Sequence, residues 1–228
     1  MDREEPDFDA LEGAVGAVRR LITHLRKTTA DPDVLRRIEK AASDFADELA
    51  PFDYEGPFHQ RQLIMDHDDD GRTMPDTRDA AEFFPYSPVV GPLNPISPKI
   101  DFELVGREFH ATHVFEPQYN GPPTAVHGGI VALVFDELLG ALGAILGIGG
   151  FTGTLQVVYR SLTPLHRPVR LRSWVDREEG VKVFIKGTMY TTDADGTDRL
   201  GAEAEGIFIR PKTSVVEQAL ERGGAASN

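Results

Sequence analysis

Hydrophobic and polar residues alternate with a period of two in six segments after residue 99, and this alternation predicts β-strands. The segments span roughly residues 100–104, 109–115, 154–162, 169–177, 181–192 and 197–210. Turn signals such as Glu179-Gly180 and Asp195-Gly196 separate the later segments, which favours antiparallel pairing. Between the second and third segments lies one long apolar stretch, residues 127–150, which we interpret as a single helix. We therefore predict an α+β fold in which a curled antiparallel sheet of about six strands surrounds one central helix.

The first fifty residues carry a helical pattern instead. Apolar residues recur there at spacings of three and four on either side of a break at residues 28–31. Asp31-Pro32 is a favourable start for the second helix, and Pro51 ends it. This pattern predicts an N-terminal helical hairpin whose apolar seams meet each other or a partner, with a packing appendage as the simpler interpretation.

Prolines, aspartates and glycines then dominate a long stretch and punctuate extended segments rather than regular elements. We expect this stretch to be a connector laid across the surface of the domain. The chain accordingly divides into four parts: the helical hairpin at residues 1–50, the Pro-rich connector at 51–98, the sheet-and-helix domain at 99–212 and a C-terminal tail at 213–228.

The amino-acid composition argues against several classes of partner and of catalytic chemistry. Of the 228 residues, 40% are hydrophobic and 27% are charged, so the chain can build a core and disorder throughout is excluded. The net charge of −13 argues against nucleic acid and anionic membranes as partners. The absence of cysteine excludes disulfides and cysteine catalysis, and an N-terminus without a signal-peptide layout favours a cytoplasmic location. Because the long apolar stretch contains Asp136 and Glu137, we expect a buried helix and no stable membrane insertion.

Asp136 lies in the middle of this apolar stretch, where an ionised carboxylate is costly unless it is paired. Such groups are retained mostly where chemistry needs them. The stretch begins with His127-Gly128-Gly129, and at a helix start the N–H groups of both glycines have no intrahelical acceptor. The helix dipole adds partial positive charge, so this end can stabilise the oxyanion that forms when a carbonyl is attacked. Asp136 would then be a general base or a nucleophile.

The spacing of Gly128 and Asp136 in the sequence leads to a further prediction. Eight helical residues separate Gly128 from Asp136, which is a rise of about 12 Å. A reacting carbonyl must lie about 3 Å from both the donor and the base, and an aspartate side chain does not bridge that gap. Either the two groups are unrelated, or a twofold dimer builds each site from the helix start of one subunit and the aspartate of the other.

The stretch from residue 100 to residue 210 also resembles the hot-dog-fold thioesterases, specifically the phenylacetate-degradation-type acyl-CoA thioesterases. The resemblance rests on His127-Gly128-Gly129, on an aspartate nine residues after that histidine, and on the block TGTLQVVYRSLTPL at residues 152–165. It implies a hot-dog fold and a homodimer with a continuous sheet, or a dimer of such dimers. It also implies hydrolysis of an acyl-CoA substrate between subunits, without a metal or redox cofactor.

The resemblance assigns roles by motif position. Gly128 is the implied oxyanion donor, Asp136 the base or nucleophile, and Thr152 the residue that holds the attacking water. Further substrate-binding candidates adjoin these positions, match an asparagine that touches the thioester, or are basic residues that could meet CoA phosphates: His127, Gly129, Asn120, Arg160 and Arg167.

Simpler interpretations stay open for several residues. Asp136 is alternatively a structural carboxylate at a dimer contact, and Thr152 an ordinary strand residue. Glu137 points about 100° away from Asp136 around the helix and should meet solvent or an arginine. His110 and His113 have an odd separation in a strand, which places them on opposite faces and disfavours a metal site. The acidic run at residues 66–71 begins like a calcium loop but has threonine at its twelfth position, which disfavours calcium.

Two other functions compete with thioester hydrolysis. An enoyl-thioester hydratase or dehydratase of the same fold is disfavoured because no histidine follows Asp136 closely. A non-catalytic acyl-CoA-binding or regulatory protein, with the N-terminal helices as its interaction module, is the alternative from a different class.

Overall fold

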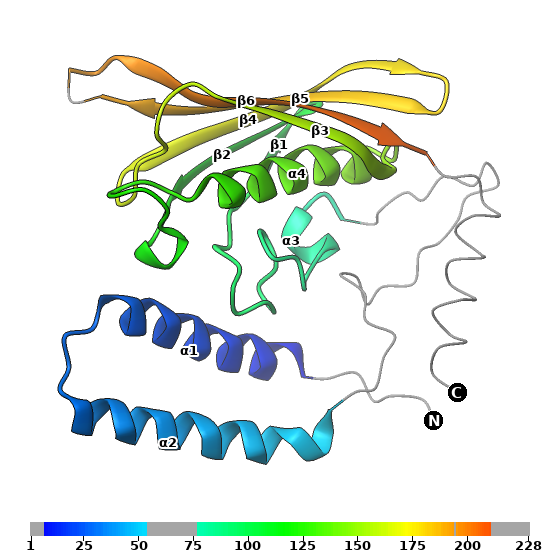
Figure 1. Ribbon diagram of the computed structural model, residues 1–228. Helices are drawn as coiled ribbons and strands as arrows, with labels where there is room; N and C mark the ends of the chain where they lie inside the picture. Colours follow the sequence, from blue (N-terminus) through cyan, green and yellow to red (C-terminus); the bar gives the residue numbers. More distant parts are fainter. Residues whose placement is uncertain (1–6, 54–76, 194, 211–228) are drawn as a thin grey trace.

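The computed structural model describes residues 7–53, 77–193 and 195–210, and it contains one curled antiparallel sheet with helices on one side (Figure 1). The six strands follow the order β1-β2-β4-β5-β6-β3, and every neighbouring pair is antiparallel. Their bounds are Glu103–Val105 for β1, Glu108–Val114 for β2, Phe151–Tyr159 for β3, Pro168–Glu179 for β4, Lys182–Thr192 for β5 and Asp198–Ile209 for β6. The predicted α+β hot-dog architecture of about six strands around one helix is confirmed.

The central helix α4, Gly128–Ile145, packs along the concave side of this sheet. Two glycines of the sheet let the helix approach closely, since an added Cβ at Gly187 would lie 3.0 Å from Cδ2 of Leu139 and one at Gly206 would lie 3.2 Å from its Cδ1. The helix is long and apolar enough to cross a membrane, but 50% of its residues are buried inside the protein. It is therefore placed as the core helix that the sequence predicts.

Residues 77–102 cover the side of α4 that faces away from the sheet. They form the short helix α3, Ala80–Phe83, followed by a series of turns (Figure 1). Apolar residues of this segment belong to the same core as α4: Ala80, Phe83, Val89, Val90, Ile100 and Phe102. The prediction of a connector across the surface is therefore wrong for Ala80, Phe83, Val89 and Val90. Ile100 and Phe102, which the alternation predicts to be strand residues, lie just before β1. Prolines exclude regular strands, but they do not prevent the apolar residues between them from being buried.

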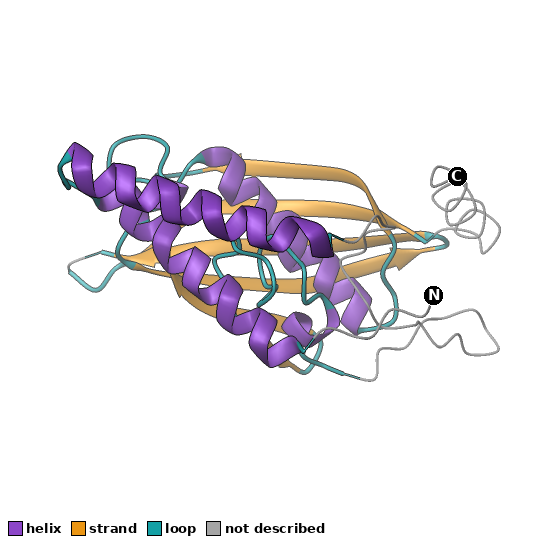
Figure 2. Ribbon diagram, turned by 90° about the horizontal axis from the view of Figure 1, so that it is seen from below, coloured by secondary structure: helices purple, strands orange, loops and turns teal. Residues whose placement is uncertain are grey.

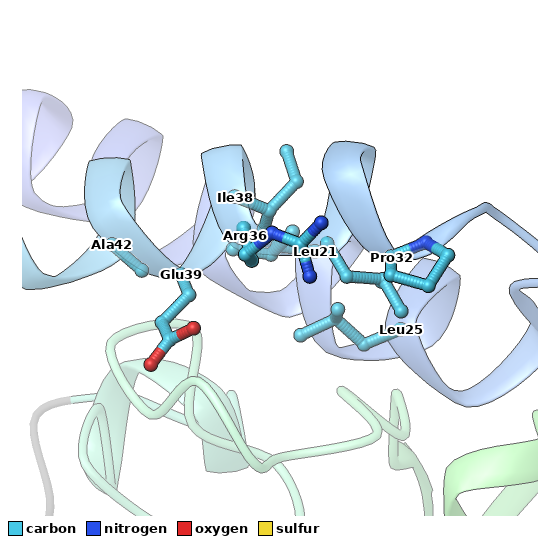
Figure 3. Close-up of a pocket in the computed structure, with 8 residues that line it drawn as sticks. Leu21, Leu25, Pro32, Arg36, Ile38, Glu39 and Ala42 are labelled. Atoms are coloured by element: carbon cyan, nitrogen blue, oxygen red, sulfur yellow. The ribbon is translucent and has the colours of Figure 1, made fainter.

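The N-terminal hairpin consists of α1, Phe8–Lys27, and α2, Pro32–Leu49, which ends in the 3₁₀ turn η1, Ala50–Phe52. Asp31 caps α2 by accepting hydrogen bonds from the N–H groups of Asp33 (2.9 Å) and Val34 (3.0 Å). Neither helix has a fully buried residue. Between them lies a shallow groove, drawn in Figure 3 and lined mainly by apolar residues: Leu21, Leu25, Pro32, Leu35, Arg36, Ile38, Glu39 and Ala42.

The helices of the described residues all lie on the same side of the sheet, and α1 separates α2 from the domain (Figures 1 and 2). The boundaries predicted between hairpin, connector, domain and tail stay a prediction. The acidic run at residues 66–71 and the predicted tail at 213–228 lie outside the described residues.

Candidate active site

The start of α4 leaves one amide free. His127 is the N-cap residue, and its Nδ1 accepts a hydrogen bond from the N–H of Gly129 at 2.9 Å. The N–H groups of Ile130 and Val131 both donate to the carbonyl of His127, at 2.9 and 3.1 Å. In the part of the chain that the structure describes, the N–H of Gly128 has no such acceptor. The expectation that both glycine amides are open is therefore wrong for Gly129, because the histidine ring occupies its amide.

Tyr159 contacts the carbonyl group of Gly128. Its hydroxyl donates to the carbonyl oxygen of Gly128 at 2.8 Å, and its ring would lie 3.6 Å from a Cβ added at that glycine. Tyr159 is the last residue of β3, so the end of this strand is joined directly to the start of α4. The sequence assigned Tyr159 no role, since nothing in a lone tyrosine near the end of a strand indicates a contact with a helix start.

Asp136 and Thr152 form the second half of the candidate site. The hydroxyl of Thr152 donates to Oδ1 of Asp136 at 2.9 Å, which joins the middle of α4 to the beginning of β3. Thr152 is exposed and Asp136 is only partly buried, because the apolar neighbours of Asp136 in sequence point to other faces of the helix. The carboxylate therefore faces an open edge of the protein, beside the 36% exposed side chain of Leu133.

A β-bulge aligns these residues. The register of β3 against β6 pairs Thr152 with Phe208 and Thr154 with Ile207, so Gly153 is an extra residue. Thr152 and Tyr159 consequently point to the same, helix-facing side of the sheet, opposite the buried residues Phe208 and Ala202. Without this bulge, Thr152 and Tyr159 would point to opposite faces of the sheet, and β3 could not make both contacts to α4.

The two halves of the site remain apart within one chain. Gly128 and Asp136 belong to the same uninterrupted helix, eight residues apart, which is a rise of about 12 Å. Both contact β3, but near its opposite ends. One chain therefore presents a free amide at one place and a hydroxyl-bound carboxylate at another, along one edge of the sheet.

Glu137 differs from its prediction. It is only partly exposed and forms no ion pair with an arginine among the described residues. It faces the segment at residues 77–102, where it hydrogen-bonds to the side chain of Ser87. The hydroxyl oxygen of Ser87 accepts from the N–H groups of Val89 (3.0 Å) and Val90 (3.2 Å), so its proton is available to the carboxylate. Oε1 of Glu137 is buried without a hydrogen-bond partner among the described residues. Burial raises the pKa of Glu137, and the neighbouring charge of Asp136 raises it further.

The remaining candidates are held by partners inside the chain. The amide nitrogen of Asn120 donates to the carbonyls of Pro122 (2.8 Å) and Ala125 (3.2 Å). Arg160 pairs with Glu203, with 3.0 Å between Nε and Oε1, and Arg167 donates to the carbonyl of Thr192. Substrate binding by these residues, and by His127 and Gly129, stays a prediction.

The described residues contain no group of three or more side chains placed to hold a metal ion. The two histidines considered for a metal have separate neighbours. His110 lies 3.2 Å from Glu108, between Nε2 and Oε2, and His113 contacts the ring of Phe115 edge to face. Burial lowers the pKa of His113.

Comparisons with known proteins bear on the fold and on the class of protein. No model of a protein family matches the chain. Acyl-coenzyme A thioesterase THEM4 of Xenopus laevis is 37% identical over 95 residues, which are 41% of this chain and 41% of that protein. THEM4 of Bos taurus is 32% identical over 94 residues, which are 41% of this chain and 37% of that protein. The chain thus spans about two fifths of the length of the curated relatives that it matches.

Similarity to a solved structure covers more of the chain than similarity to these relatives does. The crystal structure of a thioesterase superfamily protein superposes with a TM-score of 0.67 at 28% identity, covering 87% of this chain and 94% of that chain. The chain thus has the hot-dog fold and is similar to acyl-CoA thioesterases and to a solved protein of the thioesterase superfamily.

Proposed function

We propose that the protein hydrolyses acyl-CoA thioesters to the free acid and CoA, at a site that two subunits share. The similarity to proteins named acyl-coenzyme A thioesterase supports the substrate class. The single observation that carries the mechanism is the placement of the free Gly128 amide and the Asp136–Thr152 pair at two separate points along β3. Each point holds one half of what ester hydrolysis requires.

The chemistry follows from the two halves. The thioester carbonyl oxygen binds at the Gly128 N–H, where the helix dipole also favours the negative charge that develops on attack. Asp136 of the other subunit either removes a proton from an attacking water or attacks the carbonyl carbon itself. Thr152 donates to one carboxylate oxygen and so fixes its orientation. The carbon–sulfur bond then breaks, and the CoA sulfur leaves as a thiolate that takes up a proton. Where Asp136 is the nucleophile, the acyl group is left on its carboxylate as an anhydride, which water then hydrolyses to the free acid.

The edge strand β3 is the proposed subunit contact. It pairs with β6 on one side only, and it carries the exposed apolar side chains of Phe151 and Tyr159, which are 64% and 52% accessible. An unpaired edge of nine residues is a template for pairing with another chain. Antiparallel pairing of β3 with its own copy would continue the sheet across a twofold axis.

We propose the register of this contact that brings the two halves of the site together. Residues opposite each other in an antiparallel pair share a face of the sheet, and a twofold axis through Gln156 satisfies this by pairing Leu155 with Val157 of the partner subunit. Because Gly153 is an extra residue, the same register sets Thr152 opposite Tyr159 of the partner subunit. Since Thr152 holds Asp136 and Tyr159 holds Gly128, the carboxylate of one subunit then meets the free amide of the other.

The activity is tested by measuring thiol release from a panel of short, long and aromatic acyl-CoAs. Hydrolysis that is abolished by Asp136→Asn supports the proposal. Acyl-CoA binding without turnover in the intact protein contradicts it and favours the non-catalytic alternative. Mixing inactive Gly128→Pro and Asp136→Asn chains tests the shared site, because heterodimers should regain one intact site. No recovery despite demonstrated subunit exchange would refute sharing.

The register has an independent test that uses the absence of cysteine from the chain. Gln156 is exposed and contacts neither half of the site. In the proposed dimer Gln156→Cys faces its own copy with the Cα atoms about 4.5–5.5 Å apart, which suits a disulfide. Val158→Cys is the control, since its copy would lie about 13 Å away along the strand. Equal cross-linking of the two variants under oxidation would rule out this register.

A further inference from the structure

Cationic side chains join helix α1 to the domain, and none of the apolar residues of this helix is fully buried. Arg19 donates to the carbonyls of Pro92 (3.1 Å) and Asn94 (2.7 Å). Two residues near the end of the helix act in the same way, since Arg26 donates to the side-chain oxygen of Asn120 at 3.1 Å and Lys27 pairs with Glu116 at 2.5 Å. A fourth contact runs in the other direction, from Lys99 to Glu12. Because the apolar residues of α1 are at most partly buried, these directed contacts contribute to where the helix lies.

Arg19 holds the loop at residues 92–96, and this loop in turn contacts Tyr119. Its two carbonyl partners lie just before Ile96, whose carbonyl accepts a hydrogen bond from the hydroxyl of Tyr119 at 2.9 Å. Tyr119 closes the 3₁₀ turn η2, Pro117–Tyr119, and is itself buried. The guanidinium of Arg19 is thus connected to Tyr119 through one short stretch of backbone.

The same turn holds the cap of the central helix. The carbonyl of Tyr119 accepts the N–H of His127 at 2.9 Å, and the N–H of Gly121 donates to the carbonyl of Ala125 at 2.9 Å. His127 is the residue whose ring occupies the Gly129 amide and whose C-terminal neighbour is Gly128. A continuous series of contacts therefore runs from α1 through η2 to the free amide.

Arg26 also determines which way the Asn120 amide points. A guanidinium only donates hydrogen bonds, so the oxygen of Asn120 must face Arg26. The nitrogen of the amide is thereby directed to the carbonyls of Pro122 and Ala125. These two carbonyls lie in the loop that leads into His127.

We infer that α1 is a positioning element for the active site, and that Arg19 and Arg26 hold the loop at residues 116–127 so that the Gly128 amide is presented in its working geometry. The inference rests on the proposed function and gives the N-terminal hairpin a part in it. Neither arginine touches the reacting groups, and both act through the turn that carries Tyr119 and Asn120.

The test compares Arg19→Met and Arg26→Met with Arg20→Met, which removes the same charge from an exposed position of the same helix. Displacing an amide donor by a fraction of an ångström should lower kcat by about tenfold to a hundredfold. KM should change less, because these arginines contact no substrate. Arg19→Lys keeps a donor and should recover part of kcat, whereas Arg20→Met should match the natural chain.

Amide hydrogen exchange supplies a readout that does not depend on turnover. The N–H of His127 donates to Tyr119 and should exchange faster in Arg19→Met and Arg26→Met than in Arg20→Met. Unchanged exchange at His127, or unchanged kcat in both variants, overturns the inference. If the natural chain turns over no acyl-CoA, the proposed function fails, and the exchange rates still decide whether α1 positions this loop.

Discussion

Replacing Gly128 by proline removes the proposed oxyanion donor with little other disturbance. Proline is well tolerated at the first position of a helix, which is where Gly128 lies. The preceding residue, His127, has φ −63° and ψ 134°, a conformation that is compatible with a following proline. The Gly128 N–H has no protein acceptor to lose, and a Cβ there would lie at an ordinary contact distance of 3.6 Å from the Tyr159 ring. Gly128→Ala adds the Cβ but keeps the N–H, so it is the matched control.

The expected loss of kcat follows from the number of amide donors that the start of α4 supplies. Because His127 occupies the Gly129 amide, Gly128 supplies the helix-start donor alone, and loss of one such donor typically raises the barrier by about 3 kcal/mol. That corresponds to a fall in kcat of roughly two orders of magnitude. Steady-state thiol release measures this fall, while thermal unfolding of each variant checks that the fold is retained.

The comparison between the two variants decides the outcome. Gly128→Ala should keep most of the activity, and Gly128→Pro should lose it at an almost unchanged melting temperature. If both variants turn over acyl-CoA at the same rate, the amide of Gly128 is not the donor. The argument from the free amide would then be refuted, however active the protein is.

Three further predictions test other parts of the structure. Thr152→Val should lower kcat by about tenfold and Thr152→Ser should restore it, because only the hydroxyl donates to Asp136. Because burial raises the pKa of Glu137, its ionised form destabilises the folded state. Urea denaturation should therefore show the natural chain losing stability relative to Glu137→Gln as the pH rises from the ordinary glutamate pKa through the raised one, while below both pKa values the difference between the two chains should not change with pH. Phe135→Ala should lower the free energy of unfolding by about 3–5 kcal/mol in the same assay, since this ring is fully buried.

The sequence predicts most of the fold because strand alternation and turn residues are local signals. It predicts Asp136 as a site residue because a carboxylate within an apolar stretch is conspicuous. The alignment of Thr152 with Tyr159 is different, since residues seven apart in a regular strand point to opposite faces. Only the bulge at Gly153 brings them to one face, and its position depends on pairing with a strand some fifty residues away in the sequence.

Glu137 and Gly129 show a second limit of sequence reasoning. Helix geometry correctly gives the angle between Glu137 and Asp136, but it does not say that residues 77–102 fill the space on that side. Similarly, the pattern of orphan amides at a helix start does not reveal that a histidine ring, rather than the usual serine or aspartate side chain, occupies one of them. The first error comes from a tertiary partner outside the motif, and the second comes from the conformation of a side chain within the motif, which the residue pattern does not specify.

The packing of residues 80–102 against the central helix bears on how this protein can be divided experimentally. A truncated chain that starts at residue 99 would keep every strand but would expose the buried surface that Phe83, Val89 and Val90 now seal. It would also leave the carboxylate of Glu137 without Ser87. The smallest fragment that stays in solution should therefore begin before Asp79, which caps α3, and shorter fragments should precipitate on expression.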